Sequence, residues 1–180
     1  MVQACSAAKS LLYNRPDGAP ARGVAVVVSM WTGGLAVLGF VAAPEIFATL
    51  EAAEPTNGRV LAGQVFGAVF ARFQHLAWIF GAVLIGLFIA RALLGPRPRR
   101  LGLRLLVVAV MISLGAATTF AITPRIETIR TETKGSIASL PDSDSRKGEF
   151  GRLHALSSIF MLITLAGGVG LLWAESHDTH

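Results

Sequence analysis

The sequence predicts an all-α polytopic membrane protein, a four-helix bundle built from a duplicated helical hairpin. Four long apolar stretches lack Asp, Glu, Lys and Arg: Gly23–Pro44, Phe73–Ala90, Leu105–Pro124 and Leu153–Ala174. Because a helix rises about 1.5 Å per residue, each stretch covers the roughly 30 Å hydrocarbon core of a bilayer. Two further features, an uneven placement of arginine and an internal repeat, predict how the spans are oriented and related.

The first predicted span covers about residues 23–44 and follows a cytoplasmic arm of residues 1–22. The arm carries Cys5, the single cysteine, which excludes an intramolecular disulfide and a cysteine-based metal motif. The span ends at Pro44, which a membrane helix tolerates because neighbouring groups satisfy the carbonyl that the proline leaves unbonded.

The second span is predicted within a helical pattern from Gly58 to Leu94 that no proline interrupts. At about 1.5 Å per residue this pattern would measure about 55 Å, too long for one crossing. We therefore expect a break at Arg72, with an outer helix before it and the span proper over about residues 73–94. The Gly-Pro pair that follows ends the span.

The third and fourth spans, about residues 101–124 and 153–174, complete a transmembrane domain of residues 23–174. Residues 135–148 are rich in Gly, Ser and Asp and are predicted to form an exposed loop. Residues 175–180 are predicted to form a short cytoplasmic tail.

Arginine is distributed unevenly between the connections. The connection between spans two and three holds five arginines and no acidic residue: Arg91, Arg97, Arg99, Arg100 and Arg104. The connections after spans one and three mix both signs of charge. Because unopposed basic residues mark the cytoplasmic side, both termini are predicted inside, in an inner or plasma membrane. The net charge of +5 then reflects the topology, and the basic side chains contact the lipid bilayer. It does not indicate nucleic-acid binding.

A constant shift of 80 residues superposes the two halves of the chain without a gap. The shift that places Pro44 on Pro124 also places Arg72 on Arg152. Chance is the alternative explanation, because apolar spans share residues readily, but proline and arginine are rare in such spans. The register predicts two parallel copies of a hairpin related by an axis along the membrane normal.

Each span also carries small residues spaced four apart, which places them on one helix face and predicts close packing between helices. The sets are Ala25-Ser29-Gly33, Ala82-Gly86-Ala90, Ala109-Ser113-Ala117-Ala121 and Ala166-Gly170-Ala174.

Five side chains near the outer ends of the spans form what we call the outer polar layer: Glu45, Arg72, Arg125, Arg152 and His154. One interpretation is structural, an ion-pair belt in which Glu45 bonds to Arg125, Arg72 or both. The other is functional, a binding site for an anionic group, because three arginines would face one glutamate.

His75 lies at a depth similar to that of His154, on helices that the repeat places diagonally across the bundle. The two imidazoles could bind copper or both faces of a haem b iron. The alternative is that each hydrogen-bonds within the polar layer. We expect this alternative, and hence no bound metal or cofactor.

Sequence signatures of nucleotide binding, nucleophilic hydrolysis and zinc proteolysis are absent. Gly63 and Gly67 have the spacing of a helix contact, not of a phosphate-binding loop. We therefore expect no enzymatic activity.

Four segments carry a family resemblance: Ala43-Pro44-x-Ile46-Phe47-x-x-Leu50, Ala62-Gly63-x-x-x-Gly67-x-x-Phe70, Pro124-x-Ile126 and Phe150-x-x-Leu153-His154-x-x-Ser157. Over residues 24–174 the chain resembles an uncharacterised four-helix bacterial membrane family that is similar to the eukaryotic transmembrane protein 205. The resemblance marks Pro44, Phe47, Gly63, Pro124 and His154 as pattern positions and leaves out His75. It implies a bacterial inner membrane location and no particular activity.

The sequence thus predicts a small membrane bundle that binds a ligand or a partner protein through the outer polar layer, as a possible subunit of a membrane complex or a homo-oligomer. One alternative is a haem- or copper-binding protein that uses His154 and His75. Another is a small transporter working as a dimer, which the hairpin repeat permits.

Overall fold

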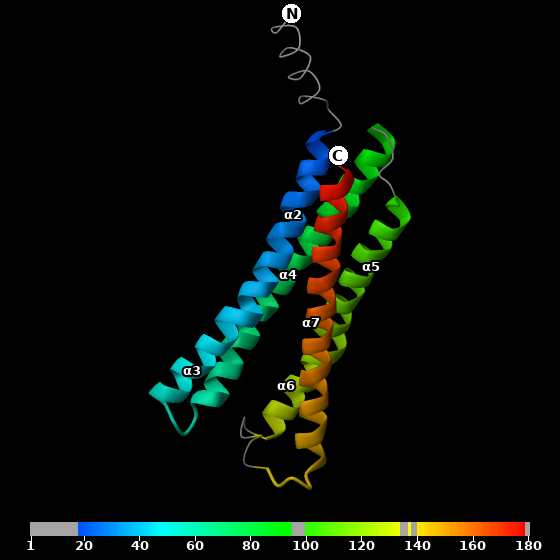
Figure 1. Ribbon diagram of the computed structural model, residues 1–180. Helices are drawn as coiled ribbons and strands as arrows, with labels where there is room; N and C mark the ends of the chain where they lie inside the picture. Colours follow the sequence, from blue (N-terminus) through cyan, green and yellow to red (C-terminus); the bar gives the residue numbers. More distant parts are fainter. Residues whose placement is uncertain (1–17, 95–99, 134–136, 138–139, 179–180) are drawn as a thin grey trace, which may run out of the picture.

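Four long helical rods make up the computed structural model, which describes residues 18–94, 100–133, 137 and 140–178 (Figure 1). The first rod is α2 (Gly18–Val37), which continues through the π-helical turn η1 (Leu38–Ala42) into α3 (Ala43–Ala53), and the second is α4 (Gly58–Leu94). The third rod is α5 (Leu101–Ala117), which continues through the π-helical turn η2 (Thr118–Ile122) into α6 (Thr123–Glu132), and the fourth is α7 (Ser145–Asp178). Each rod is long and apolar enough to cross a membrane, which confirms the predicted all-α fold with four candidate spans. Cys5, most of the predicted arm and part of the 135–148 loop lie outside the described residues.

Three helix boundaries differ from the expectation. Helix α7 begins at Ser145, so the last four residues of the predicted 135–148 loop are helical. Among the described residues, α2 already includes Gly18–Arg22 of the predicted arm, and α4 runs unbroken past Arg72, so the predicted break is wrong. The residues beside Arg72 include neither proline nor glycine, and nothing in the chain unwinds the helix there. Since its 37 residues measure about 55 Å, α4 extends well beyond a bilayer core of about 30 Å.

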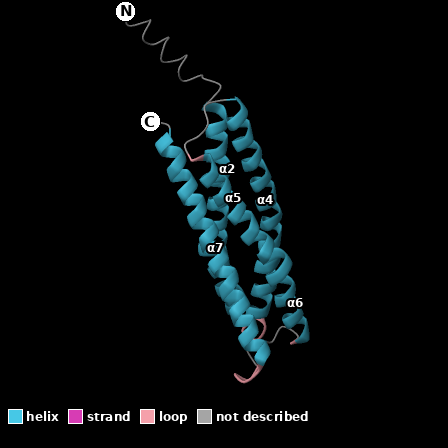
Figure 2. Cartoon of the chain, turned by 90° about the vertical axis from the view of Figure 1, so that its right-hand side faces the viewer, coloured by secondary structure: helices cyan, strands magenta, loops and turns pink. Residues whose placement is uncertain are grey.

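The rods form a ring in which α2 packs on α4, α4 on α5, α5 on α7 and α7 on α2. The rods α2 and α5 are therefore diagonal, as are α4 and α7, which matches the arrangement expected of two hairpins. The start of α2, the end of α7 and the facing ends of α4 and α5 lie together at what we call the terminal end (Figures 1 and 2). Helices α3 and α6 lie at the opposite end, the α3/α6 end.

The hydrophobic core lies in the half of the bundle nearer the terminal end. It is built around buried Trp31 of α2, Leu84 and Phe88 of α4, Met111 of α5 and Leu171 of α7. Toward the other end the ribbon separates into two hairpins, α3 with the start of α4 and α6 with the start of α7 (Figure 1). The bundle is thus closed at the terminal end and splayed at the α3/α6 end.

Each π-helical turn lies immediately before a helix whose second residue is a proline, Pro44 in α3 and Pro124 in α6. The backbone N–H of Ala43 donates to the carbonyl of Leu38, five residues earlier, and Thr123 donates to Thr118 in the same way. A proline follows each donor, and its ring would clash with the preceding turn of a regular α-helix. The wider turn gives the chain room for that ring. The shift that superposes the sequence halves also brings the two turns into register, since it places Leu38 on Thr118.

The three glycines among the small residues spaced four apart do not form the helix contacts that we expected. A Cβ added at Gly33, Gly86 or Gly170 would meet no atom within 4 Å, and all three positions are exposed. The close approach occurs instead at Gly168 of α7, where an added Cβ would overlap with Cγ2 of Thr32 on α2. Spacing alone identifies a helix face but not its direction, and here those glycines face outward.

Candidate functional site

At the α3/α6 end, Arg125 of α6 forms a bidentate ion pair with Glu149 of α7. Its Nε donates to Oε1 of Glu149 at 2.6 Å, and its Nη2 donates to Oε2 at 3.0 Å. Both side chains are well exposed, at 53% and 38%. An exposed pair of this kind contributes little to stability, so its main effect is to orient the two groups and to link α6 with α7.

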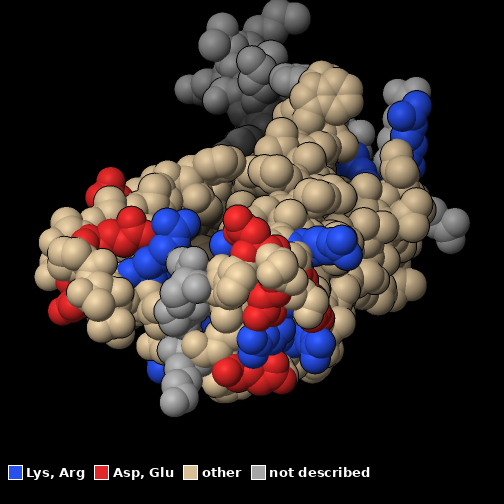
Figure 3. All heavy atoms as spheres, turned by 90° about the horizontal axis from the view of Figure 1, so that it is seen from below, with Lys and Arg blue, Asp and Glu red and all other residues tan. Residues whose placement is uncertain are grey.

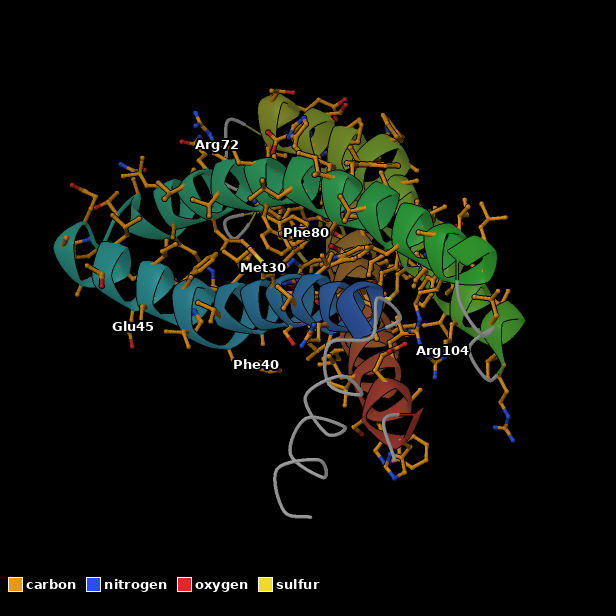
Figure 4. All side chains as sticks on the ribbon, turned by 90° about the horizontal axis from the view of Figure 1, so that it is seen from above. Met30, Phe40, Glu45, Arg72, Phe80 and Arg104 are labelled. Atoms are coloured by element: carbon orange, nitrogen blue, oxygen red, sulfur yellow. The ribbon has the colours of Figure 1, made fainter. Side chains whose placement is uncertain are left out.

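Glu45, the predicted partner of Arg125, lies elsewhere. It is exposed on α3, and Figure 4 shows its side chain pointing away from the bundle. Among the residues that the structure describes, it has no ion pair, so the prediction of a Glu45–Arg125 pair is wrong. The two positions are equivalent in the repeat, and equivalent positions fall on the diagonal rods of the ring.

Arg72 and Arg152 are exposed, and neither has an ion pair within the described part of the chain. Arg72 precedes Arg91 of the terminal end by about 28 Å of helix. The outer polar layer and the terminal end are therefore separated by about one hydrocarbon thickness. The Arg72–Arg91 separation thus matches the thickness of a bilayer core.

Arg130 of α6 links the two hairpins, although the sequence pattern did not single it out. Its guanidinium lies over two glycines of α4: an added Cβ would be 2.9 Å from Nη2 at Gly63 and 3.5 Å from Nη1 at Gly67. Arg130 also donates to Glu127 at 2.8 Å and lies 6.0 Å from the ring centre of Phe150 on α7. The Gly-x-x-x-Gly spacing was the available signal, but it accommodates a side chain rather than a helix backbone.

The structure does not bring His75 and His154 together. Both are exposed, and they belong to the diagonal rods α4 and α7. Nδ1 of His75 lies 2.8 Å from the carbonyl oxygen of Ala71, and the His154 ring is parallel to that of Phe150 with centroids 6.2 Å apart. Each imidazole thus contacts its own helix. Within the described residues, no group of three or more His, Cys, Asp or Glu side chains could hold a metal ion.

A cavity of about 30 Å³ lies inside the bundle between the core and the polar layer. Its wall includes the polar side chains of Gln74, Thr118, Ser157 and Thr164 among aromatic and aliphatic residues such as Trp31. This space suffices for about two water molecules, which polar groups of this kind can hold. It is too small for a drug-sized ligand.

The terminal end contains a buried ion-pair cluster that joins three rods. Nη1 of Arg91 on α4 donates to both carboxylate oxygens of Glu175 on α7, at 2.8 Å each. Nη1 of Arg104 on α5 donates to Oε1 of Glu175, and its Nη2 donates to the carbonyl of Ala174 at 3.1 Å. Figure 4 shows Arg104 on the α7 side of the bundle. The sequence pattern indicated only a topology signal here, because the shared acid lies far away along the chain, beyond the third span.

Seen from the α3/α6 end, basic and acidic side chains are interleaved (Figure 3). Residues 45–72 and 125–152 together hold eight basic and eight acidic residues, so the remaining eight basic and three acidic residues account for the whole net charge of +5.

One local ion pair joins Asp144 and Arg146 at the start of α7. The Arg146 guanidinium and backbone N–H donate to the Asp144 carboxylate, which lowers its pKa to about 2.

Comparison with known proteins places this architecture in a family. No significant match to the chain was found among curated proteins or among solved structures. Residues 26–134 match a family described as a domain of unknown function, DUF4149. The match includes both π-helical turns and ends before α7, so His154 lies outside it. Because the match covers more than half of the 180 residues, the chain belongs to the DUF4149 family.

Proposed function

We propose that this protein is a non-enzymatic membrane protein that binds an acidic ligand or partner protein through the outer polar layer. The supporting observation is a contrast between the two ends of the bundle. At the terminal end, Arg91 and Arg104 form ion pairs with Glu175, where the helices pack closely together. At the α3/α6 end, Arg72 and Arg152 are exposed without an ion pair in the described residues, and the hairpins separate.

An exposed arginine at a membrane boundary is suited to binding an anion. Its planar guanidinium donates two parallel hydrogen bonds to a carboxylate or phosphate, and a less polar environment strengthens them. Arg125 already makes such a bidentate contact with Glu149. Because that pair is exposed and weak, an acidic group of a partner could replace Glu149 at little cost.

We also propose that the α3/α6 end faces outward, with both termini cytoplasmic in an inner or plasma membrane. The support is the net charge, which falls entirely outside residues 45–72 and 125–152 of the sequence. Cysteines placed one at a time at Ala53 and Arg100, in a Cys5→Ser background, test the orientation. A membrane-impermeant thiol reagent applied to intact cells should label the first and spare the second, and the reverse pattern would contradict the proposal.

Duplication of a hairpin is the proposed origin of the two halves. The two π-helical turns support it, because the repeat brings them into register and each precedes its proline at the same distance. Members of the family should then keep proline at both Pro44 and Pro124, and loss of either one independently in many members would argue against a shared origin.

The similarity to transmembrane protein 205 remains a prediction. The described contacts favour neither the haem or copper alternative nor a dimeric transporter.

Site-specific photocross-linking in native membranes tests the proposed binding end. The photoreactive residue benzoylphenylalanine replaces Thr128, exposed on α6, or Gly102, exposed on α5 at the terminal end. An added side chain at Gly102 meets no atom within 4 Å, so this control should fold normally. We expect an adduct of defined mass at Thr128, visible as a partner chain or as a small ligand by intact mass spectrometry, and none at Gly102. Equal adducts at both ends, or none at Thr128, would contradict the proposal.

A further inference from the structure

An open groove runs between α2 and α4 near the outer polar layer. Its volume is about 450 Å³, and its lining is apolar except for one side chain. Gly33 and Val37 of α2 face Phe73 and Leu76 of α4, and Arg72 is the exception. Most of these residues are exposed on a rod that is apolar enough to span a membrane, so lipid would lie against the groove.

The glycine pair of α2 creates the space. A Cβ added at Gly33 would meet no atom within 4 Å, which means that a side chain there would occupy the groove itself. Beside it, the ring of Phe73 packs over Gly34, where an added Cβ would lie 2.6 Å from Cε2. The Phe73 ring, packed on Gly34, therefore forms one wall of the groove, and the groove is open where Gly33 lacks a side chain.

Arg72 supplies a positive charge at one membrane boundary. It lies about 28 Å along α4 from Arg91 of the terminal end, and it has no ion pair among the described residues. An arginine near the hydrocarbon edge is costly unless its guanidinium reaches an anion or the interface. Lipid phosphates lie at that depth, and a phospholipid adds an apolar chain to the anion.

We infer that this groove is a binding site for an anionic phospholipid, with an acyl chain between α2 and α4 and the headgroup phosphate bonded to Arg72. Such a lipid complements the site: its acyl chain is apolar like the walls of the groove, and its phosphate carries a negative charge opposite to that of Arg72. Arg152, the equivalent of Arg72 in the repeat, is equally exposed but does not line this groove. The inference rests on the proposed function only through Arg72, which the groove shares with the outer polar layer; the other groove residues belong to α2, η1 and α4. Loss of the lipid contact would leave the expected adduct at Thr128 unchanged, so the two proposals can fail separately.

Native mass spectrometry of the detergent-solubilised full chain tests the site with phosphatidylglycerol and phosphatidylcholine. We expect one phosphatidylglycerol per chain to be retained, and phosphatidylcholine to be retained at least about tenfold more weakly, since its choline cation offsets the phosphate charge and is repelled by Arg72. Arg72→Gln should weaken phosphatidylglycerol binding by a similar factor, and Arg72→Lys should largely restore it. Gly33→Leu should block both lipids by filling the groove.

Two matched variants serve as controls. Arg152→Gln removes an equally exposed arginine, and Gly86→Leu adds the same side chain at another glycine with nothing within 4 Å. Both should keep lipid binding. Equal retention of the two lipids, or equal effects of the groove variants and their controls, would show ordinary boundary lipid only and would overturn the inference.

Discussion

Nη1 of Arg91 lies 2.8 Å from both carboxylate oxygens of Glu175, so that one buried acid holds α4 against α7 across the diagonal of the bundle. Arg104 of α5 donates to the same carboxylate. The cluster therefore joins the first hairpin to the second at the terminal end. No comparable buried pair joins them among the described residues of the α3/α6 end, which is consistent with the splayed hairpins there.

Glu175→Gln should destabilise the protein strongly, because it leaves two buried guanidinium groups without their counter-charge. Breaking a buried ion pair by removing one partner costs about 3 to 5 kcal/mol. The free energy of unfolding in mild detergent measures the effect. Glu54→Gln, an exposed change at the α3–α4 connection, is the control and should have little effect. Equal stability of the two variants would show that the buried cluster does not hold the bundle together.

Gly168→Ala should destabilise the contact between α2 and α7. The added methyl overlaps with Thr32, whose hydroxyl is fixed by donating to the carbonyl of Val28 at 2.6 Å. Overpacking of this kind costs about 1 to 3 kcal/mol. Gly170→Ala, further along α7, meets no atom within 4 Å and should be neutral or slightly stabilising. Thermal unfolding of both variants checks the difference, and a stable Gly168→Ala chain would refute the close approach.

Gly63→Leu should release the hairpins at the α3/α6 end, because the new side chain displaces the Arg130 guanidinium from its place over α4. Spin labels at Ala53 and Thr128, one on each hairpin, report the separation by double electron–electron resonance. The distance distribution should broaden or shift to longer values. Gly148→Leu, an exposed change on α7 with no neighbouring atom within 4 Å, should leave it unchanged. Identical distributions in all three chains would mean that Arg130 does not link the hairpins.

The Asp144 carboxyl should titrate near pH 2 in the folded protein, below its ordinary value of about 3.9. A carboxyl whose pKa is lowered on folding contributes stability above its unfolded pKa, and this contribution is lost as the pH falls from about 4 toward 2. The first turn of α7 should therefore loosen over that range. The carboxyl carbon shift in an NMR titration measures the pKa. Arg146→Ala should raise it toward its ordinary value, and an unshifted wild-type value would contradict the pair.

The sequence predicted the number and type of the elements because the four spans are long, apolar and separated by charge or proline. It could not predict which side chains meet. Repeat equivalence suggested Glu45 as the partner of Arg125, but the Glu45 side chain points away from the bundle, and the actual partner is Glu149. The partners Arg91 and Glu175 were missed for a similar reason, since pairing across a bundle depends on helix rotation, which charge counts do not contain.

The proposed function requires Arg72 and Arg152, the exposed arginines without an ion pair in the described residues, to bind an acidic group. Benzoylphenylalanine at Thr128 measures this directly when the adduct yield is compared between the wild-type chain, Arg152→Glu and Arg59→Glu. The two substitutions change the charge equally, but Arg59 already pairs with Glu51 in the described structure. We predict that Arg152→Glu lowers the adduct yield at least about tenfold, since a charge-assisted contact becomes repulsive, while Arg59→Glu retains the adduct. An adduct that persists in Arg152→Glu, or is lost equally in both variants, would contradict the proposed function.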